Sequence, residues 1–140
     1  NVYGPHKIQK SDDYNIINYF IDQALKDEQL TIYGDGRQLR DYLFIDDLTE
    51  VFIKASLLEV SNGQIYNFGA GTGIKFKDMA ALIAKIVGRG KLNFVKWPKN
   101  FKEVETGSYI TDLTKVKKDL GFSPKISFEE GVKRTIREQL

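Results

Sequence analysis

The sequence contains no cysteine, which excludes disulfide bonds, thiolate nucleophiles and cysteine-bound metal sites. It contains one histidine, His6, which cannot form a histidine metal cluster alone, so we predict no metal site. No apolar run approaches the ~18 residues that a membrane-spanning helix needs, and no signal peptide is visible. These absences predict a cytoplasmic protein with no membrane partner.

The sequence also lacks a strong charge of one sign. Its 21 basic and 19 acidic residues alternate along the chain and leave a net charge of +2. The densest basic cluster is the short run KVKKD at 115–119. Because a nucleic-acid groove needs a concentrated basic face, we predict solvated helix surfaces and no nucleic-acid partner.

The spacing of apolar residues predicts helices and strands in a mixed order. Apolar residues three and four apart predict five helices, at 14–26, from 47, at 76–87, from 112 and from 127. Runs rich in β-forming residues predict four strands, at 30–34, 41–45, 64–68 and 92–97. This order predicts an α/β or mixed α+β architecture. The run at 64–68 suits a parallel sheet, but too few strands are present to complete one.

Short local signals predict how these elements begin and end. Asp35 and Gly36 predict a hairpin turn between the first two strands. Asp47 and Ser127 are each followed three residues later by a glutamate, which predicts two helix-capping boxes. Gly88 predicts the C-terminal cap of the helix at 76–87.

The glycine-rich turn at Gly69, Gly71 and Gly73 lies where a dinucleotide fingerprint would lie, between a strand and a helix. Its spacing fails, because Ile74 stands where the third glycine belongs and no acidic residue follows about 20 positions on. We interpret it as a tight strand-to-helix turn. No nucleophile elbow is present, and the two glutamates of the predicted loop at 99–109 favour surface acids over an acid–base pair.

Four segments occur in a characteristic order: NVYGP at 1–5, LTIYGDGRQLRDYLFIDDL at 30–48, GQIYNFGAGTG at 63–73 and DLTKVKKDLGFSPKISFEEGVKRTI at 112–136. In this order the chain resembles the C-terminal part of NAD-dependent sugar-nucleotide epimerases and dehydratases, the extended short-chain dehydrogenase/reductase family. The most specific element is the GDGxQxRDY pattern at 34–42. The resemblance covers essentially the whole chain.

The resemblance implies that residues 1–140 are a single substrate-binding fragment. It implies an N-terminal Rossmann domain that binds NAD and carries the catalytic Tyr-x-x-x-Lys pair, both upstream of Asn1. The chain begins without methionine and reads as cut from something larger. We therefore expect no catalytic residue here and no activity from these residues alone. Some elements would complete the missing Rossmann sheet.

The resemblance also implies which residues bind a nucleotide-diphosphate sugar. Arg40 would reach a phosphate, since its planar guanidinium offers two charge-assisted hydrogen bonds to one phosphate. Asn1 would contact the sugar diphosphate, Asn15 and Ile16 would line the nucleotide pocket, and Tyr33 would pack near the base.

Structural alternatives remain open for these residues. Arg40 could pair with Asp41 or Asp46, Asn1 could only satisfy the backbone of a turn, and Tyr33 could belong to the core.

The chain departs from the family in two places. The loop FKEVETGSYITD at 101–112 lacks the second diphosphate-binding arginine, for which Lys99 or Lys102 could substitute as a point charge. Lys75 stands where many relatives begin the next helix with serine or threonine, so the cap must come from elsewhere.

The expected function is the substrate-binding portion of a homodimeric, UDP-glucose 4-epimerase-like enzyme, which acts at sugar C4 by transient hydride transfer with NAD. The alternatives are a 4,6-dehydratase or a related reductase and, from another class, a stand-alone nucleotide-sugar binding module. The run at 64–68 and the helix from Asp47 would pack against the missing sheet. In isolation we expect their apolar faces to be exposed and the fragment to self-associate or rearrange.

Overall fold

The computed structural model describes residues 1–5 and 15–138, so His6 and Tyr14 lie outside the described residues. The helices are α1 Ile16–Leu25, α2 Ile45–Leu57, α3 Phe76–Val87, α4 Lys99–Glu103, α5 Thr114–Leu120 and α6 Phe128–Arg137, with a 3-10 turn, η1, at Glu59–Ser61. The strands are β1 Val2–Tyr3, β2 Gln29–Tyr33, β3 Leu39–Asp41, β4 Leu43–Phe44, β5 Gly73–Lys75 and β6 Lys91–Val95. The predicted mixed α/β architecture is confirmed.

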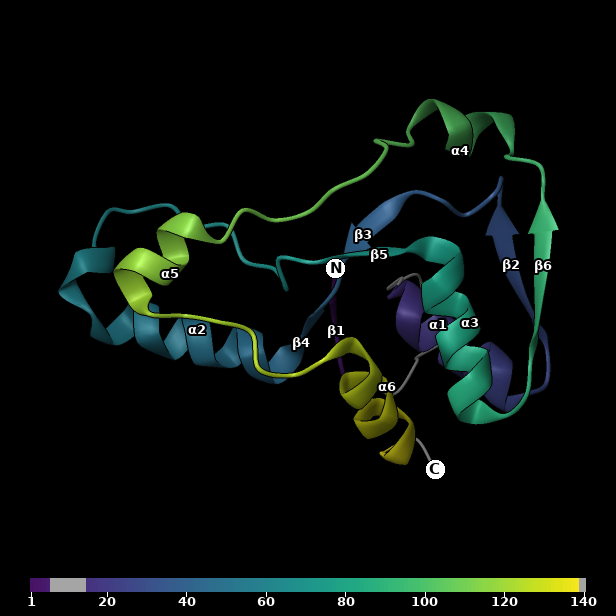
Figure 1. Cartoon of the computed structure of the whole chain (residues 1–140), viewed down its shortest axis with the longest axis horizontal. Helices are drawn as coiled ribbons and strands as arrows, with labels where there is room; N and C mark the ends of the chain where they lie inside the picture. The colour runs from purple at the N-terminus through teal and green to yellow at the C-terminus, as the bar shows by residue number, and fades with distance from the viewer. Residues whose placement is uncertain (6–14, 139–140) are drawn as a thin grey trace.

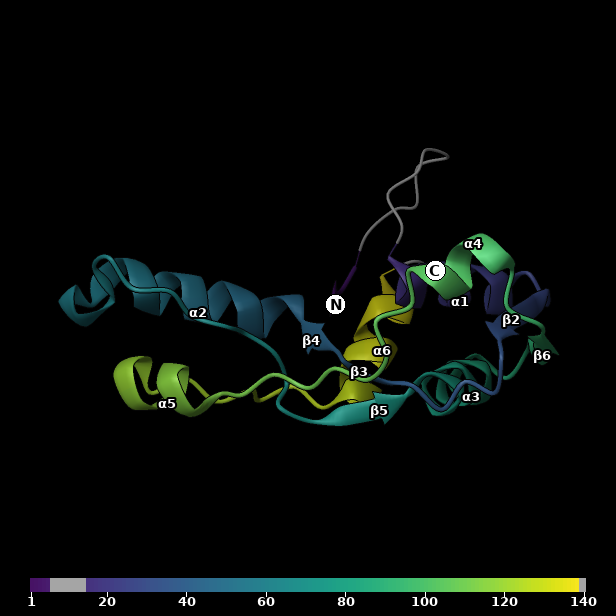
Figure 2. The same cartoon turned by 90° about the horizontal axis from the view of Figure 1, so that it is seen from above.

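The elements form an elongated molecule with two lobes (Figures 1 and 2). The first lobe packs α1 and α3 against β2 and β6, with α6 beside them (Figure 1). Its largest fully buried side chains are Tyr3, Ile17, Phe20, Ile21, Leu30, Ile32, Met79, Ile83 and Val132. The second lobe packs α5 along α2 (Figure 2) around a separate cluster: Leu43, Val51, Leu113, Val116, Leu120 and Phe122. Each lobe thus has a small core of its own.

The strands pair in three separate couples, and the predicted hairpin is wrong. β2 runs parallel to β6, with Tyr33 opposite Val95, and β3 runs antiparallel to β5, with Arg40 opposite Ile74. β1 and β4 form the third couple, which is parallel. The run at 41–45 is divided between β3, β4 and the start of α2. The first two predicted strands therefore never pair with each other.

The turn predicted to close that hairpin caps a helix instead. Gly34 and Gly36 both have positive φ, 69° and 64°, a region that disfavours side chains. The carbonyl of Gly36 accepts the Lys77 N–H at 3.0 Å, and the carbonyl of Gln38 accepts the Phe76 N–H at 3.0 Å. These bonds satisfy free N–H groups at the start of α3, whose N-cap residue has no side-chain capping bond. The missing serine or threonine cap is thus supplied by backbone carbonyls.

Most of the other predicted helix ends are confirmed. The Ser127 hydroxyl caps α6 by accepting the Glu130 N–H at 3.3 Å, but the Glu130 carboxylate accepts from Arg134 and does not complete the predicted capping box. Gly88 ends α3 in the left-handed conformation with φ of 77°. Within the predicted loop at 99–109, residues 99–103 form α4, which was not expected.

The capping role predicted for Asp47 is wrong. Phe44 precedes the first turn of α2 without a side-chain cap, and Asp47 lies inside the helix. Its buried carboxylate accepts the Lys125 N–H at 3.1 and 3.2 Å and the Ile126 N–H at 3.0 Å. Glu50 pairs with Lys125 and does not cap the helix. Asp47 therefore holds the segment before α6 against α2.

A second buried carboxylate, Asp41, lies at the end of β3 with 3% of its surface exposed. It accepts three backbone N–H groups, from Ala70 at 2.6 Å, Gly71 at 3.1 Å and Thr111 at 3.0 Å. A Cβ at Gly69 would lie 2.3 Å from the Asp41 carboxylate, so only glycine fits there. The predicted tight turn is therefore built around an anion that belongs to the protein itself.

Residues 64–68 form no strand, against the prediction. The side chain of Ile65 is 86% exposed, and no neighbouring strand pairs with this run in the described part of the chain. A strand needs a partner for its N–H and C=O groups. The parallel sheet that was expected to pair with residues 64–68 is not found in the described part of the chain.

The outer face of α2 is exposed and apolar, as predicted. Phe52, Ile53 and Leu57 are 56%, 54% and 76% exposed. The two hydroxyls nearby turn back onto the helix, since Thr49 donates to the carbonyl of Ile45 and Ser56 to that of Ile53. This face therefore offers few polar groups to water. In the described ranges, no helix combines the length and apolarity needed to cross a bilayer.

We expect the chain to self-associate through the outer face of α2, and Phe52→Lys to shift it toward monomer. A charge on the apolar face would have to be desolvated on association. Light scattering against concentration measures this, with Thr106→Lys, on an exposed loop, as a control that adds the same charge. A strictly monomeric chain whose amides at 65–68 are protected from hydrogen exchange would contradict the prediction.

We expect Asp41→Asn to lower the free energy of unfolding by about 3 kcal/mol, because hydrogen bonds to a charged acceptor contribute ~1.5–3 kcal/mol each. The amide NH2 would face N–H donors, and at least one would lose its acceptor. Urea unfolding measures the change. Asp35→Asn is the control, since Asp35 is exposed, accepts the Arg37 N–H and pairs with the exposed Arg37 side chain at 3.4 Å. Equal stability of the two variants would show that the three bonds do not hold the turn.

Candidate functional site

A cavity of about 150 Å³ lies where the ends of β2 and β6, the start of α3 and the loop after α4 meet. Its lining residues are Ile16, Thr31, Tyr33, Gln38, Arg40, Phe76, Trp97 and Glu105. Three of the five predicted site residues, Ile16, Tyr33 and Arg40, are therefore brought together in one cavity. Its walls are mostly apolar, with one cation and one anion among them.

The cation, Arg40, lies on β3 and has two protein acceptors beyond its own strand. Its Nη2 lies 2.5 Å from a Glu105 carboxylate oxygen, and its Nη1 donates to the Gly107 carbonyl. Nη1 also donates to the Leu39 carbonyl at 3.0 Å. The Arg40 and Glu105 side chains are 19% and 22% exposed, so this ion pair is largely shielded from water.

The two acidic partners considered for Arg40 from the sequence are wrong. Asp41 accepts backbone N–H groups from two loops. Asp46 instead pairs with Arg134 of α6, with 3.5 Å between the Asp46 carboxylate and the Arg134 guanidinium. The observed partner, Glu105, is 65 residues away in sequence, and only the return of the 104–109 loop to β3 brings it close.

An aromatic wall flanks the cavity. The Tyr33 ring stacks on Phe101 with centroids 5.6 Å apart and planes at 25°, and meets Trp97 at 5.6 Å and 47°. A Cβ on Gly34 would lie 2.2 Å from the Trp97 ring nitrogen, so glycine is needed for this close approach. Half-buried rings of this kind offer a flat apolar surface for a planar ligand group.

The other two predicted site residues do not line the cavity. Asn15 precedes Ile16 and caps α1: its oxygen accepts the Ile17 N–H at 3.1 Å and its amide donates to the Val2 carbonyl at 2.7 Å. Asn1 is exposed, and its carbonyl accepts the Leu43 N–H at 3.1 Å. Asn15 therefore acts as the cap of α1, and Asn1 contributes a backbone hydrogen bond between β1 and β4.

Sequence reasoning missed Glu105 and Trp97. Glu105 lies in the loop where many relatives carry an arginine. The signal available in the sequence was its negative charge, which can pair with the positive charge of Arg40. Trp97, the single tryptophan, follows a strand directly before Pro98. The proposed substitutes for the missing arginine, Lys99 and Lys102, are exposed on α4 and do not line the cavity.

The tyrosine of the RDY pattern is not available as a base. Tyr42 is buried, and burial raises the pKa of its hydroxyl far above the usual range, although Arg40 opposes the rise. It therefore stays protonated at physiological pH. Over the described ranges, no three histidine, cysteine, aspartate or glutamate side chains gather as a metal site would require.

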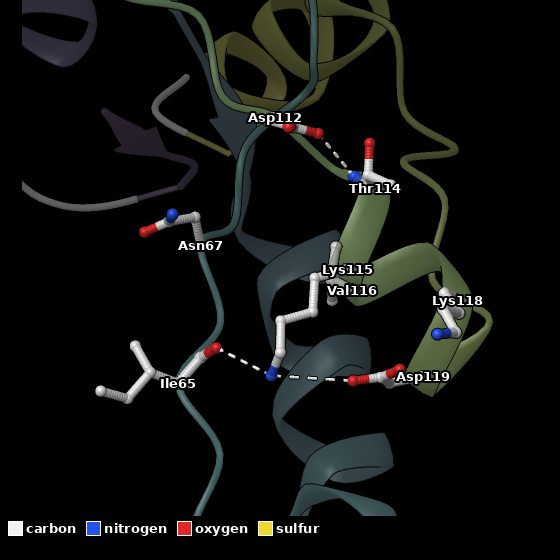
Figure 3. Close-up of a pocket in the computed structure, with 8 residues that line it drawn as sticks. All are labelled: Ile65, Asn67, Asp112, Thr114, Lys115, Val116, Lys118 and Asp119. Atoms are coloured by element: carbon white, nitrogen blue, oxygen red, sulfur yellow. Dashed lines mark hydrogen bonds and ion pairs between the residues drawn. The ribbon is translucent and has the colours of Figure 1, made fainter.

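A second cavity, of about 440 Å³, lies between residues 65–67 and α5 (Figure 3). Lys115 reaches across it to the Ile65 carbonyl at 3.2 Å and lies 3.7 Å from Asp119 (Figure 3). Its ammonium also sits 3.9 Å from the centre of the Tyr66 ring. Lys115 therefore connects residues 64–66 to α5. This structural role accounts for the cation without a ligand in the cavity.

Known proteins resemble the chain over nearly all of its length. A family profile described as GDP-mannose 4,6 dehydratase matches residues 1–135. A UDP-N-acetyl-alpha-D-glucosaminuronate decarboxylase of Bacillus cytotoxicus is 33% identical over 143 aligned positions, which cover 98% of this chain and 43% of the decarboxylase. Decarboxylation lies outside the activities that the sequence predicted.

Two solved structures share the fold. A UDP-glucose 4-epimerase from Thermotoga maritima, solved with UDP-glucose, has a TM-score of 0.86 and 29% identity, over 99% of this chain and 43% of that one. A UDP-glucuronic acid 4-epimerase from Bacillus cereus, in complex with UDP-glucuronic acid and NAD, has a TM-score of 0.79 and 28% identity, over 98% of this chain and 42% of that one.

The chain spans less than half the length of each of these relatives. The match of the profile to residues 1–135 nonetheless covers almost the whole chain, and the shared fold agrees with it. The chain therefore belongs to the family of NAD-dependent sugar-nucleotide epimerases and dehydratases, the extended short-chain dehydrogenase/reductases.

Proposed function

We propose that residues 1–140 are the C-terminal substrate-binding part of a UDP-glucose 4-epimerase-like enzyme, acting at sugar C4 by transient hydride transfer. The observation that carries this proposal is the position of Arg40, the cation of a small cavity beside an aromatic wall. A nucleoside diphosphate combines the two groups that such a cavity can bind, a phosphate and a planar base.

In this proposal Arg40 binds a phosphate oxygen, and the wall of Tyr33 and Trp97 packs against the base. Anchoring both ends of the nucleotide would fix the position of the sugar relative to a reacting partner. Such orientation can contribute ~7 kcal/mol or more to catalysis. Asn1 stays a predicted contact of the sugar diphosphate, since it lies at the exposed start of β1.

NAD does not fit the glycine-rich turn of this chain. The space over Gly69 is filled by the Asp41 carboxylate, which would repel a pyrophosphate. The proposal therefore assigns NAD binding, and the catalytic Tyr-x-x-x-Lys pair, to an N-terminal Rossmann domain. The exposed outer face of α2 and the unpaired run at 64–68 support a further layer of that kind. The homodimer and the cytoplasmic location stay predictions from the sequence.

The second candidate is a 4,6-dehydratase or a related reductase, which would use the same nucleotide cavity. The family profile that matches residues 1–135 favours the dehydratase among these. A stand-alone nucleotide-sugar binding module is the alternative of another class. A glycine-rich strand-turn-helix and a Tyr-x-x-x-Lys pair upstream of Asn1 would decide for the enzyme.

We expect Arg40→Ala to weaken UDP binding by about thirtyfold or more, because a charge-assisted hydrogen bond contributes about 2 kcal/mol or more. Isothermal titration calorimetry of the 140-residue chain with UDP measures this. Arg37→Ala removes the same charge three residues away, where Arg37 is 75% exposed, and should change the affinity less than twofold. Equal affinity of Arg40→Ala and the unchanged chain would contradict the diphosphate assignment.

We also expect the chain alone to convert no UDP-glucose in the presence of NAD, even where it binds UDP. Its glycine-rich turn does not fit NAD, because the Asp41 carboxylate fills the space over Gly69, and its buried Tyr42 stays protonated. Product analysis by chromatography after long incubation measures this, with an intact epimerase as the positive control. Any turnover abolished by Arg40→Ala would contradict the expectation that the reacting groups lie upstream.

A further inference from the structure

The anion beside Arg40 belongs to the protein. Glu105 approaches the guanidinium at 2.5 Å, inside a cavity where both side chains are about four-fifths buried. The proposed function needs the same guanidinium to bind a phosphate. Two anions cannot share one edge of the guanidinium, because they repel each other strongly in a partly desolvated site.

The loop that carries Glu105 is wrapped around the guanidinium. The Glu105 carboxylate accepts the Gly107 N–H at 2.9 Å, while the Gly107 carbonyl accepts a hydrogen bond from Arg40. Further along, the Ser108 hydroxyl accepts the Leu39 N–H at 3.0 Å. Residues 105–107 are thus attached to β3 through Arg40, whereas Ser108 and Tyr109 are attached through the backbone of Leu39. If Arg40 turned to another anion, the attachment of residues 105–107 would be lost.

The surroundings of the loop leave it room to move. The side chain of Val104 is 71% exposed, and that of Tyr109 is 52% exposed. At Gly107, where φ is 77°, no atom lies within 4 Å of the position of a Cβ. Outward movement of residues 105–107 would therefore displace little packed side chain.

We propose that Glu105 is an internal counter-anion, which a nucleoside diphosphate displaces from Arg40 as it binds, releasing residues 105–107 from β3. This inference rests on the proposed function, because it assumes that Arg40 binds phosphate. It makes Glu105 a residue that sets phosphate affinity: the ligand gains only the difference between its own pairing with Arg40 and the one it replaces. Uridine has no phosphate to pair with Arg40, so it should not displace Glu105.

The experiment compares Glu105→Gln with Glu103→Gln, which removes the same charge from an exposed position on α4. The fluorescence of Trp97, the single tryptophan and a lining residue of the cavity, reports binding of UDP and of uridine. We expect Glu105→Gln to bind UDP about tenfold more tightly, since one competing charge is removed. We expect no change for uridine and none for Glu103→Gln.

Hydrogen exchange of the unchanged chain gives a second readout. Saturation with UDP should speed the exchange of the Gly107 amide, whose acceptor Glu105 would leave β3, whereas a simple ligand contact would slow it. The Tyr109 amide donates to the Leu39 carbonyl at 3.1 Å and not to the Arg40–Glu105 pair, so its exchange should not change. Equal UDP affinity for the unchanged chain and Glu105→Gln, or slower exchange at the Gly107 amide on UDP binding, would overturn the inference and leave the proposed function intact. No UDP binding to either chain would overturn both.

Discussion

The buried carboxylate of Asp41 joins three parts of the chain, two of which, β3 and the loop after α4, carry residues of the candidate site. It lies directly after Arg40 and accepts N–H groups from the glycine-rich turn and from Thr111, where the loop after α4 returns. An ionised acceptor with three donors is a strong local restraint, since bonds to charged groups are worth roughly twice neutral ones. The restraint sets where β3 stands relative to the loop that carries Glu105. The geometry of the cavity depends on it.

Two aspartates in this chain replace what regular structure usually supplies. Asp41 satisfies the N–H groups of a turn, and Asp47 satisfies those of the segment that leads into α6. Both are buried without a cation as their hydrogen-bond partner, and both bind backbone over more than 25 residues of sequence. Because buried polar groups must be paired, these carboxylates define how the segments without regular structure cross between the two lobes.

Charge in the candidate cavity is balanced within the protein. Arg40 and Glu105 neutralise each other, and the aromatic rings beside them contribute no charge. Such a cavity does not attract anions from a distance, so recognition would depend on exchange of one anion for another at short range. The outer face of α2 differs in kind, because its apolar side chains gain from contact with any large apolar surface.

Local structure was determined largely by the sequence alone. The bounds of α3, the Ser127 cap and the amphipathic stripe of α1 follow from residues a few positions apart, and the GDGxQxRDY pattern pointed to Arg40 and to the family. Pairing was decided by tertiary structure: β2 with β6, β3 with β5, Asp47 with the backbone at 125–126, and Arg40 with Glu105. These partners are 32 to 79 residues apart. The residues a few positions away show which kinds of group a side chain can bind. Which of those groups comes within reach depends on the path of the whole chain.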